Sequence, residues 1–167
     1  MTVGVKERAA SHAFDFWMGR WNVRNRRLVR RLAGSDEWDE FEAKVAARPL
    51  PGGLGNEDVF CSDYGGGFIG MSFRFFDPES GLWAIYWTDT RRTGPTLGPP
   101  VIGSFSNGIG IFEGEDTFEG RPIRVRLVWS GVDGPTPRWE QAFSEDGGET
   151  WETNWIMDFT RALEVAA

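Results

Sequence analysis

The chain has 167 residues, a length that one domain with a sizeable buried core accounts for, so we expect a single domain over residues 1–167. Its formal charge of −7 argues against nucleic acid as a partner, because affinity for nucleic acid comes mainly from neutralising phosphates. Cys61 is the only cysteine, which excludes an intrachain disulfide, and residues 1–15 hold no apolar run typical of a secretion signal. We therefore expect a cytoplasmic protein that makes no contact with a membrane.

Short alternating segments separated by glycine-rich turns run through the whole chain. Nine Trp, thirteen Phe and 22 Gly suit strands that bury aromatic faces and are joined by tight turns. A helical turn is expected before Gly19, and strands are expected near residues 20–32, 37–47, 57–62, 68–77, 82–90, 101–106, 109–116, 121–131, 137–144 and 150–161. The pattern predicts an all-β fold, a closed antiparallel up-and-down β-barrel of about ten strands with a short N-terminal helical plug. The linkers 48–55 and 91–100 are rich in Pro and Gly and are expected to be loops at a barrel mouth.

The first predicted strand is dense in arginine, and the second is dense in acidic residues. A tight hairpin turn at Gly34 would set Arg30 beside Asp39 and Arg27 beside Glu42. Each such pair contributes about 0.2–1 kcal/mol and mainly fixes strand register. We interpret these arginines as structural, in preference to the alternative that they form an anion-binding site.

The segment from Ser144 to Trp151 reads S-x-D-x-G-x-T-W and resembles the Asp-box hairpin of sialidases and other β proteins. In such a hairpin the Asp146 carboxylate would accept backbone N–H bonds within the turn, and the tryptophan would pack beneath it. A sialidase would carry several copies, whereas this chain has one. We interpret the segment as a structural turn.

Histidine and cysteine offer little chemistry. His12 is the only histidine and precedes the first strand, so neither a Ser-His-Asp triad nor a multi-histidine metal site is easily assembled, and no metal is expected. Cys61 lies in an apolar run and is interpreted as a small buried residue. No cofactor is expected.

Strand alternation predicts where a ligand would bind. In the last strand, Trp151, Thr153 and Trp155 share the face expected to point inward, and Asn154 is expected outside. The predicted ligand-binding residues are Trp87, Asp89, Arg91, Trp139, Gln141, Phe143 and Trp155. Because ten strands enclose more volume than their side chains readily fill, we expect a pocket of about 300 Å³ or more, with aromatic walls and a few polar groups.

Both ends of the chain carry motifs that resemble a known superfamily. Gly19-Arg20-Trp21 and the late Arg161 resemble the G-x-W element and the arginine of lipocalins, which belong to the calycin superfamily. The elements F-x-F-W-x-G-x-W and S-x-D-G-G-x-T-W-x-x-N-W-x-M-x-F-x-R also resemble those of bacterial calycin-like proteins with no established activity. The resemblance implies that Arg161 packs across Trp21 and that both residues, with Gly19, close the barrel.

The leading hypothesis is binding of a small, largely apolar or aromatic molecule inside the barrel. Calycins also include haem proteins, but a haem-binding relative uses a histidine late in the chain, and this chain has none after His12. Other calycins are enzymes, so the alternative is a cofactor-independent isomerase, cyclase or lyase acting on a small hydrophobic metabolite. Asp89 and Arg91 are then the catalytic candidates, because burial would raise the pKa of such a carboxylate and suit it to proton transfer.

A third hypothesis is an interaction module. If the barrel were incompletely closed, residues 109–112 would form an exposed strand edge able to pair with a second copy, giving a homodimer, or with another partner.

Overall fold

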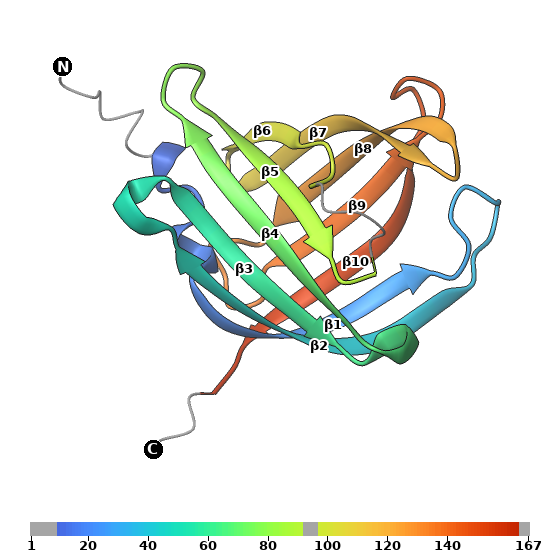
Figure 1. Ribbon diagram of the computed structural model, residues 1–167, viewed down its shortest axis with the longest axis horizontal. Coiled ribbons are helices and arrows are strands. Elements are labelled where there is room, and N and C mark those ends of the chain that lie inside the picture. Colours follow the sequence, from blue (N-terminus) through green and yellow to red (C-terminus); the bar gives the residue numbers. More distant parts are fainter. Residues whose placement is uncertain (1–9, 92–96, 164–167) are drawn as a thin grey trace.

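The computed structural model describes residues 10–91 and 97–163, which form ten β-strands (Figure 1). Neighbouring strands are antiparallel, and the sheet closes on itself in the order β1-β10-β9-β8-β7-β6-β5-β4-β3-β2. The strands are β1 (Gly19–Leu28), β2 (Trp38–Pro49), β3 (Gly55–Ser62), β4 (Phe68–Asp77), β5 (Leu82–Asp89), β6 (Val101–Ser106), β7 (Ile109–Phe118), β8 (Arg121–Ser130), β9 (Arg138–Ser144) and β10 (Glu152–Arg161). The all-β class, the strand number and the antiparallel closure predicted from sequence are confirmed.

Alternation of apolar and polar residues explains which face of each strand is buried. Along β8, the buried residues are Ile123, Val125, Leu127 and Trp129, and the residues between them are half-buried on the outer face. A fully buried side chain of this kind contributes about 1.5–3 kcal/mol through the hydrophobic effect. The core therefore lies inside the barrel.

The first and last strands meet at a seam. Trp21 of β1 stands opposite Arg161 of β10, and the Arg161 guanidinium carbon lies 3.8 Å from the centre of the Trp21 ring. The same guanidinium donates to the carbonyl oxygens of Phe16 and Met18. A Cβ at Gly19 would lie 2.7 Å from an Arg161 nitrogen, and Gly19 has a φ of +111°, so glycine leaves room for the arginine. A closed ten-stranded barrel of this kind fits a calycin-like fold.

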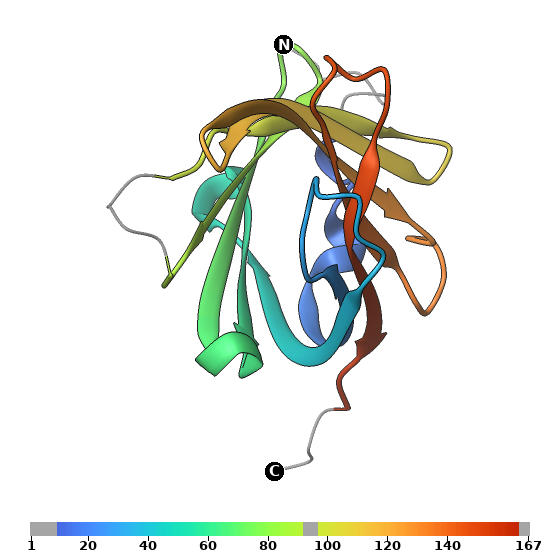
Figure 2. The ribbon, with the colours of Figure 1, turned by 90° about the vertical axis from the view of Figure 1, so that its right-hand side faces the viewer.

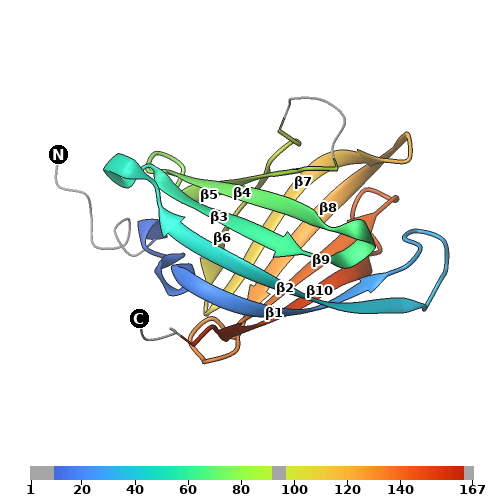
Figure 3. The same cartoon turned by 60° about the horizontal axis from the view of Figure 1, so that its bottom comes forward.

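The described segment before β1, residues 10–18, does not form the expected helical plug. It contains one 3-10 turn, η1 (Asp15–Trp17), which no side chain caps and after which Met18 is already extended. Aromatic side chains of this segment nevertheless reach the core, because Phe14 and Trp17 are 1% and 2% exposed. The Trp21 indole N–H donates to the carbonyl oxygen of Trp17 at 2.8 Å, which ties η1 to β1. Figure 3 shows η1 beside the start of β1, at one end of the barrel.

The connections between strands lie at the two ends of the barrel, and the direction of each strand decides at which end the next connection lies. Residues 50–54, which include η2 (Pro51–Gly53), connect β2 to β3 at the end that carries η1. The opposite end, which we call the distal end, faces the viewer in Figure 2. Its connections follow β1, β3, β5, β7 and β9 and comprise residues 29–37, 63–67 with η3 (Tyr64–Gly66), 90–91 and 97–100, 119–120, and 145–151.

The two linkers expected at a barrel mouth therefore lie at opposite ends. Part of the first linker is regular, since Arg48 and Pro49 belong to β2 and Gly55 to β3. In the second linker, residues 92–96 lie outside the described residues. The ladder between β5 and β6 runs from Trp83 to Ile85, and closer to the distal end the Gly98 backbone N–H donates to the carbonyl oxygen of Trp87 at 3.1 Å.

The β1–β2 hairpin differs from the prediction in its register. Its connection spans residues 29–37 instead of the predicted tight turn. Arg27 consequently stands opposite Asp39 and not opposite Glu42. The predicted pairing of Arg30 with Asp39 is also wrong, because Arg30 lies in the connection. Arg27 continues the alternation of the buried residues Trp21, Val23 and Asn25 along β1, so it is on the inner face.

Residues 109–112 do not form an exposed edge. β7 pairs with β6 on one side and with β8 on the other. Closure of the barrel thus satisfies the backbone groups that an edge strand would offer to a partner. The condition on which the interaction hypothesis depended, an incompletely closed barrel, is therefore not met.

Candidate functional site

A cavity of about 180 Å³ lies inside the barrel. It is smaller than the expected volume of about 300 Å³, because large aromatic rings occupy much of the interior. Its aromatic walls include Trp87, Trp129, Trp139, Phe143 and Trp155. An apolar cavity of about 150 Å³ holds a benzene-sized ring, so this cavity has room for one ring with a small substituent.

Five of the seven predicted ligand-binding residues line this cavity. They are Trp87, Trp139, Gln141, Phe143 and Trp155. The other two, Asp89 and Arg91, are not among the lining residues. Asp89 is connected to the cavity through Trp87, whose indole N–H donates to the Asp89 carboxylate at 3.1 Å.

Neighbouring residues hold the indole walls in place. A Cβ at Gly70 of β4 would lie 2.0 Å from the Trp87 ring, so the absence of a side chain there makes room for the indole. The Trp155 indole N–H donates to Asn25 Oδ1 at 3.0 Å, and both residues are buried. The ring of Trp139 meets that of Trp155 edge to face, with 5.6 Å between ring centres. Gly70 and Asn25 were not predicted as parts of the site.

The inner and outer faces of β10 differ from the prediction because this strand contains a β-bulge. Thr153 pairs with Ala142 and Trp155 with Gln141, so Asn154 is an extra residue in β10. Asn154 is completely buried, and its Oδ1 accepts a hydrogen bond from Gln141 Nε2 at 2.9 Å, whereas Thr153 is exposed. The predictions that Thr153 faces inward and Asn154 outward are wrong, because one inserted residue reverses the alternation before it.

The turn before β10 lies outside the cavity. Asp146 accepts hydrogen bonds from the Thr150 hydroxyl and backbone N–H and from the Ser144 hydroxyl. These bonds, those from Thr150 above all, hold the pKa of Asp146 far below its ordinary range. Trp151 is on the outer face, not the inner face as predicted, and the Arg126 guanidinium lies 3.9 Å from the centre of its ring. The contacts are those of a structural turn.

A buried ion pair at the cavity was not predicted from the sequence. The side chains of Asp58 and Arg74 are 4% and 5% exposed, and their nearest oxygen and nitrogen are 2.6 Å apart. The Trp17 indole N–H also donates to Asp58, and Arg74 donates to Asn56 Oδ1. Within the described residues, the buried Arg74 Nε and the Trp129 indole nitrogen have no hydrogen-bond acceptor. The alternation of buried residues along β3 and β4 would have placed this pair inside the barrel.

Asp89 does not have the raised pKa that its burial predicted. Burial raises the pKa of this carboxyl, but hydrogen bonds from the Arg91 backbone and side chain and from the Trp87 indole outweigh it and leave the pKa below its ordinary value. The Arg91 backbone N–H donates at 2.8 Å, and its side-chain Nε lies 3.4 Å from the carboxylate. Asp89 is therefore ionised at neutral pH and is a poor proton donor.

Three arginines lie at the distal end: Arg27 in β1, Arg31 in the connection that follows, and Arg91 after β5. The guanidinium carbon of Arg27 lies 4.8 Å from the ring centre of Trp155, and that of Arg91 lies 3.7 Å from the ring centre of Phe68. The guanidinium carbon of Arg31 lies 4.8 Å from the ring centre of Phe118 and 5.6 Å from that of Phe143. Two of these rings, Trp155 and Phe143, also line the cavity.

The arginines at the distal end are partly desolvated and repel one another. Burial, followed by the charges of Arg31 and Arg91, lowers the pKa of Arg27 to about 10. Burial, followed by the charge of Arg91, also lowers the pKa of Arg31. These side chains remain cationic at neutral pH, in surroundings that disfavour their charge.

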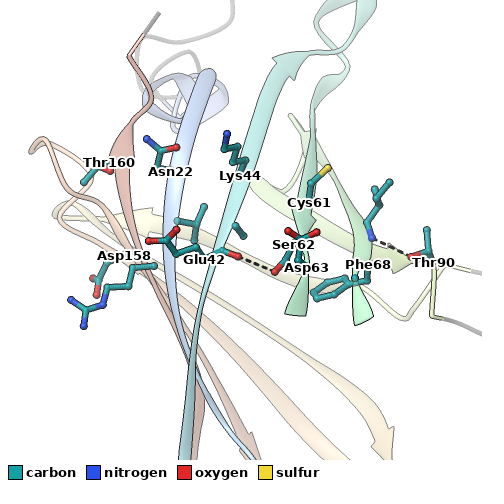
Figure 4. Close-up of a pocket in the computed structure, with 15 residues that line it drawn as sticks. Asn22, Glu42, Lys44, Cys61, Ser62, Asp63, Phe68, Thr90, Asp158 and Thr160 are labelled. Atoms are coloured by element: carbon teal, nitrogen blue, oxygen red, sulfur yellow. Dashed lines mark hydrogen bonds between the residues drawn. The ribbon is translucent and has the colours of Figure 1, made fainter. Parts of the chain in front are cut away.

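A second hollow lies on the outside of the barrel, across the outer face of β1 to β4 and β10 (Figure 4). It is an open groove of about 1150 Å³. Acidic, basic and amide side chains such as Glu42, Lys44 and Asn22 are spread along it, and Cys61 is exposed there rather than buried as predicted. No aromatic wall comparable to that of the cavity lines this groove, so the candidate site is the cavity.

Residues that can hold a metal ion do not cluster in the described part of the chain, where no group of three or more His, Cys, Asp or Glu side chains is suitably placed. His12 is exposed, and its Nδ1 lies 2.8 Å from an Asp15 carboxylate oxygen. His12 is not among the residues that line the cavity.

Comparison with models of known protein families gives no match for this chain, and no curated protein matches it in sequence. Among the described residues, no helix has the length and apolar character needed to cross a membrane.

Proposed function

We propose that this barrel binds a small molecule built on one aromatic or apolar ring and carrying a hydrogen-bond acceptor. The observation that supports this most directly is an aromatic cavity of about 180 Å³ whose wall includes two buried N–H donors without an acceptor, Arg74 Nε and Trp129 Nε1. Ligand sites typically combine apolar walls with a few directional polar groups.

The unpaired donors indicate which group the ligand carries. A buried N–H without an acceptor costs about 1–3 kcal/mol, a cost that a carbonyl or hydroxyl oxygen of a ligand would remove. Both donors belong to side chains that line the cavity. Gln141, which also lines it, already donates to Asn154, and its carbonyl oxygen adds an acceptor to the same wall.

Binding of benzamide and of toluene, followed by calorimetry or ligand-observed NMR, tests this proposal. Benzamide has a ring and a carbonyl, and toluene has a ring of the same size without an acceptor. In the Trp129→Phe variant we expect benzamide to bind about threefold to tenfold more weakly, the worth of one neutral hydrogen bond, and toluene to bind as in the wild type.

The matched control is Trp151→Phe, the same chemical change on the outer face of the barrel. It should leave the affinity for both compounds unchanged. Failure of both compounds to bind, or equal losses in the two variants, would contradict the proposal.

The seam supports a second part of the proposal, that the barrel is a calycin. Arg161 stacks on Trp21 next to Gly19, the arrangement that the resemblance to lipocalins implies. A set of homologues that retained the ten strands but replaced the glycine, the tryptophan and the arginine independently of one another would contradict this assignment.

The alternative, a cofactor-independent isomerase, cyclase or lyase, is favoured by one observation. The Asp58 carboxylate lies in the cavity wall beside Arg74, where it could move a proton of a bound molecule. Exchange of the α-protons of phenylacetaldehyde with D₂O, followed by NMR, tests this reaction class. The wild type should accelerate the exchange and a folded Asp58→Asn variant should not. Equal rates with and without the protein would rule out this reaction.

A further inference from the structure

We infer that the ligand of the cavity carries a carboxylate, which binds to Arg27, Arg31 and Arg91 at the distal end of the barrel. This inference rests on the proposed function, because the ring of the same molecule occupies the cavity. It identifies the ligand class as a small aromatic or alicyclic acid.

The arginines are continuous with the cavity wall. Arg27 lies over the ring of Trp155 and Arg31 over the ring of Phe143, and both rings line the cavity. A ring stacked inside the cavity would therefore have its distal edge next to guanidinium groups. Guanidinium N–H groups form a planar fork that matches the two oxygens of a carboxylate.

The protein itself leaves these charges largely unpaired. Among the described residues, neither Arg27 nor Arg31 has a carboxylate oxygen within 4 Å, and no hydrogen bond of either side chain is found. Only Arg91 has an acidic partner, Asp89, at 3.4 Å. Stacking on aromatic rings offsets part of the cost of burying a guanidinium, but it supplies no acceptor for the N–H groups.

Two acidic groups at the distal end, Asp39 and Glu152, already have hydrogen-bond donors, and the Glu119 carboxylate, whose charge acts on Arg31, forms no ion pair with it among the described residues. Asp39, opposite Arg27, accepts a hydrogen bond from the Tyr64 hydroxyl at 2.6 Å. Glu152 accepts one from the Leu32 backbone N–H at 2.8 Å. Burial, followed by repulsion from Arg31 and Arg91, lowers the pKa of Arg27, so an added negative charge at the distal end would stabilise this guanidinium.

Strand direction gives this ligand an orientation. Trp129 and Arg74 lie toward the ends of β8 and β4, both of which run toward the η1 end. Arg27 lies near the end of β1, which runs toward the distal end. The carboxylate would thus lie at the distal end, the ring between the aromatic walls, and an acceptor oxygen, where the ligand has one, toward Arg74 and Trp129.

Three probes compared at pH 7 test the inference: benzoate, its neutral near-isostere benzamide, and acetate, which has the charge without the ring. We expect benzoate to bind at least about tenfold more tightly than benzamide, because charge-assisted hydrogen bonds are roughly twice as strong as neutral ones. Acetate should bind too weakly to detect. Raising NaCl from about 0.05 M to about 0.5 M should weaken benzoate binding and leave benzamide binding unchanged, since salt screens partly exposed charges.

Arg27→Gln and Arg31→Gln identify the binding groups. Each should weaken benzoate binding about tenfold and leave benzamide binding within about twofold of the wild type. Arg24→Gln is the matched control, because Arg24 lies on the outer face of the same strand and its loss changes the net charge equally. Thermal unfolding establishes that each variant is folded, and the salt dependence needs no variant.

The outcomes separate this inference from the proposed function. Equal affinities for benzoate and benzamide would overturn the inference and leave the proposed function standing. The inference would also be overturned if benzoate bound more tightly than benzamide but Arg27→Gln and Arg31→Gln did not weaken benzoate binding. The same holds if Arg24→Gln weakened benzoate binding as much as they do. If neither benzoate nor benzamide binds, the proposed function itself fails.

Discussion

Arg161 and Trp21 join the two ends of the chain, because the guanidinium carbon of Arg161 lies 3.8 Å from the centre of the Trp21 ring. The contact is reinforced by hydrogen bonds from the same guanidinium to the backbone before β1. These groups are at the η1 end of the barrel, away from the arginines of the distal end. Their role is therefore closure of the barrel.

Arg161→Ala should lower the free energy of unfolding by about 2 kcal/mol, because it removes a cation–π contact and two charge-assisted hydrogen bonds. Urea unfolding measures the change. Arg138→Ala, which removes an exposed ion pair with Asp158, is the control and should cost about 1 kcal/mol or less. Benzamide affinity of the folded Arg161→Ala protein should equal that of the wild type, and a large loss of affinity would place Arg161 in the binding machinery.

Gly70→Ala should reduce both stability and benzamide binding. The new methyl group would overlap the Trp87 ring and push the indole toward the cavity, at a cost of about 1–3 kcal/mol for overpacking. Calorimetry with benzamide and thermal unfolding measure the two effects. Gly134→Ala is a suitable control, because a Cβ at Gly134 meets no atom closer than 3.5 Å. Unchanged benzamide binding in folded Gly70→Ala would mean that Trp87 is not a binding wall.

Asp146→Asn should destabilise the protein in a manner that depends on pH. The pKa of Asp146 is held below its ordinary value of 3.8 in the folded protein, so the ionised carboxylate stabilises the fold above that pH. The contribution is lost as the pH falls through the folded pKa. The melting temperature of the wild type should thus exceed that of the variant at pH 7, and the difference should shrink below about pH 4. A difference independent of pH would indicate a role for shape alone.

Asp89→Asn should tighten benzoate binding by about threefold, because the variant removes the negative charge that partly neutralises Arg91. Benzamide has no charge and should bind the variant and the wild type equally. Calorimetry at low salt measures both affinities. Weaker benzoate binding would show that Asp89 serves mainly to orient Arg91.

Local patterns were sufficient to predict the strands and much of the cavity wall. Alternation with a period of two residues identified ten strands, and it placed Trp87, Trp139 and Phe143 on faces that line the cavity. This success has a simple cause: within one strand, the side-chain pattern depends only on the chain itself.

Apart from the seam between β1 and β10, features that depend on the register between two strands were not predicted. The register of the β1–β2 hairpin follows from a connection longer than a tight turn, and an error of three residues paired Arg27 with Glu42 instead of Asp39. The ion pair between Asp58 and Arg74 joins two strands whose relative register the sequence does not specify. Arg27 and Arg31 belong to the β1–β2 hairpin and Arg91 follows β5, so the closed barrel is needed to bring Arg91 beside the other two.

The bulge at Asn154 adds one residue to β10 and thereby changes which residues of this strand face the barrel interior. Residues after it build the cavity wall and the seam, whereas Trp151 and Thr153 before it lie on the outer face. Thr153 and Trp155 pair with successive residues of β9, so they keep opposite faces although one residue stands between them. The inserted Asn154 adds a buried amide that accepts a hydrogen bond from Gln141 at the cavity, and its deletion would leave a regular strand without that contact.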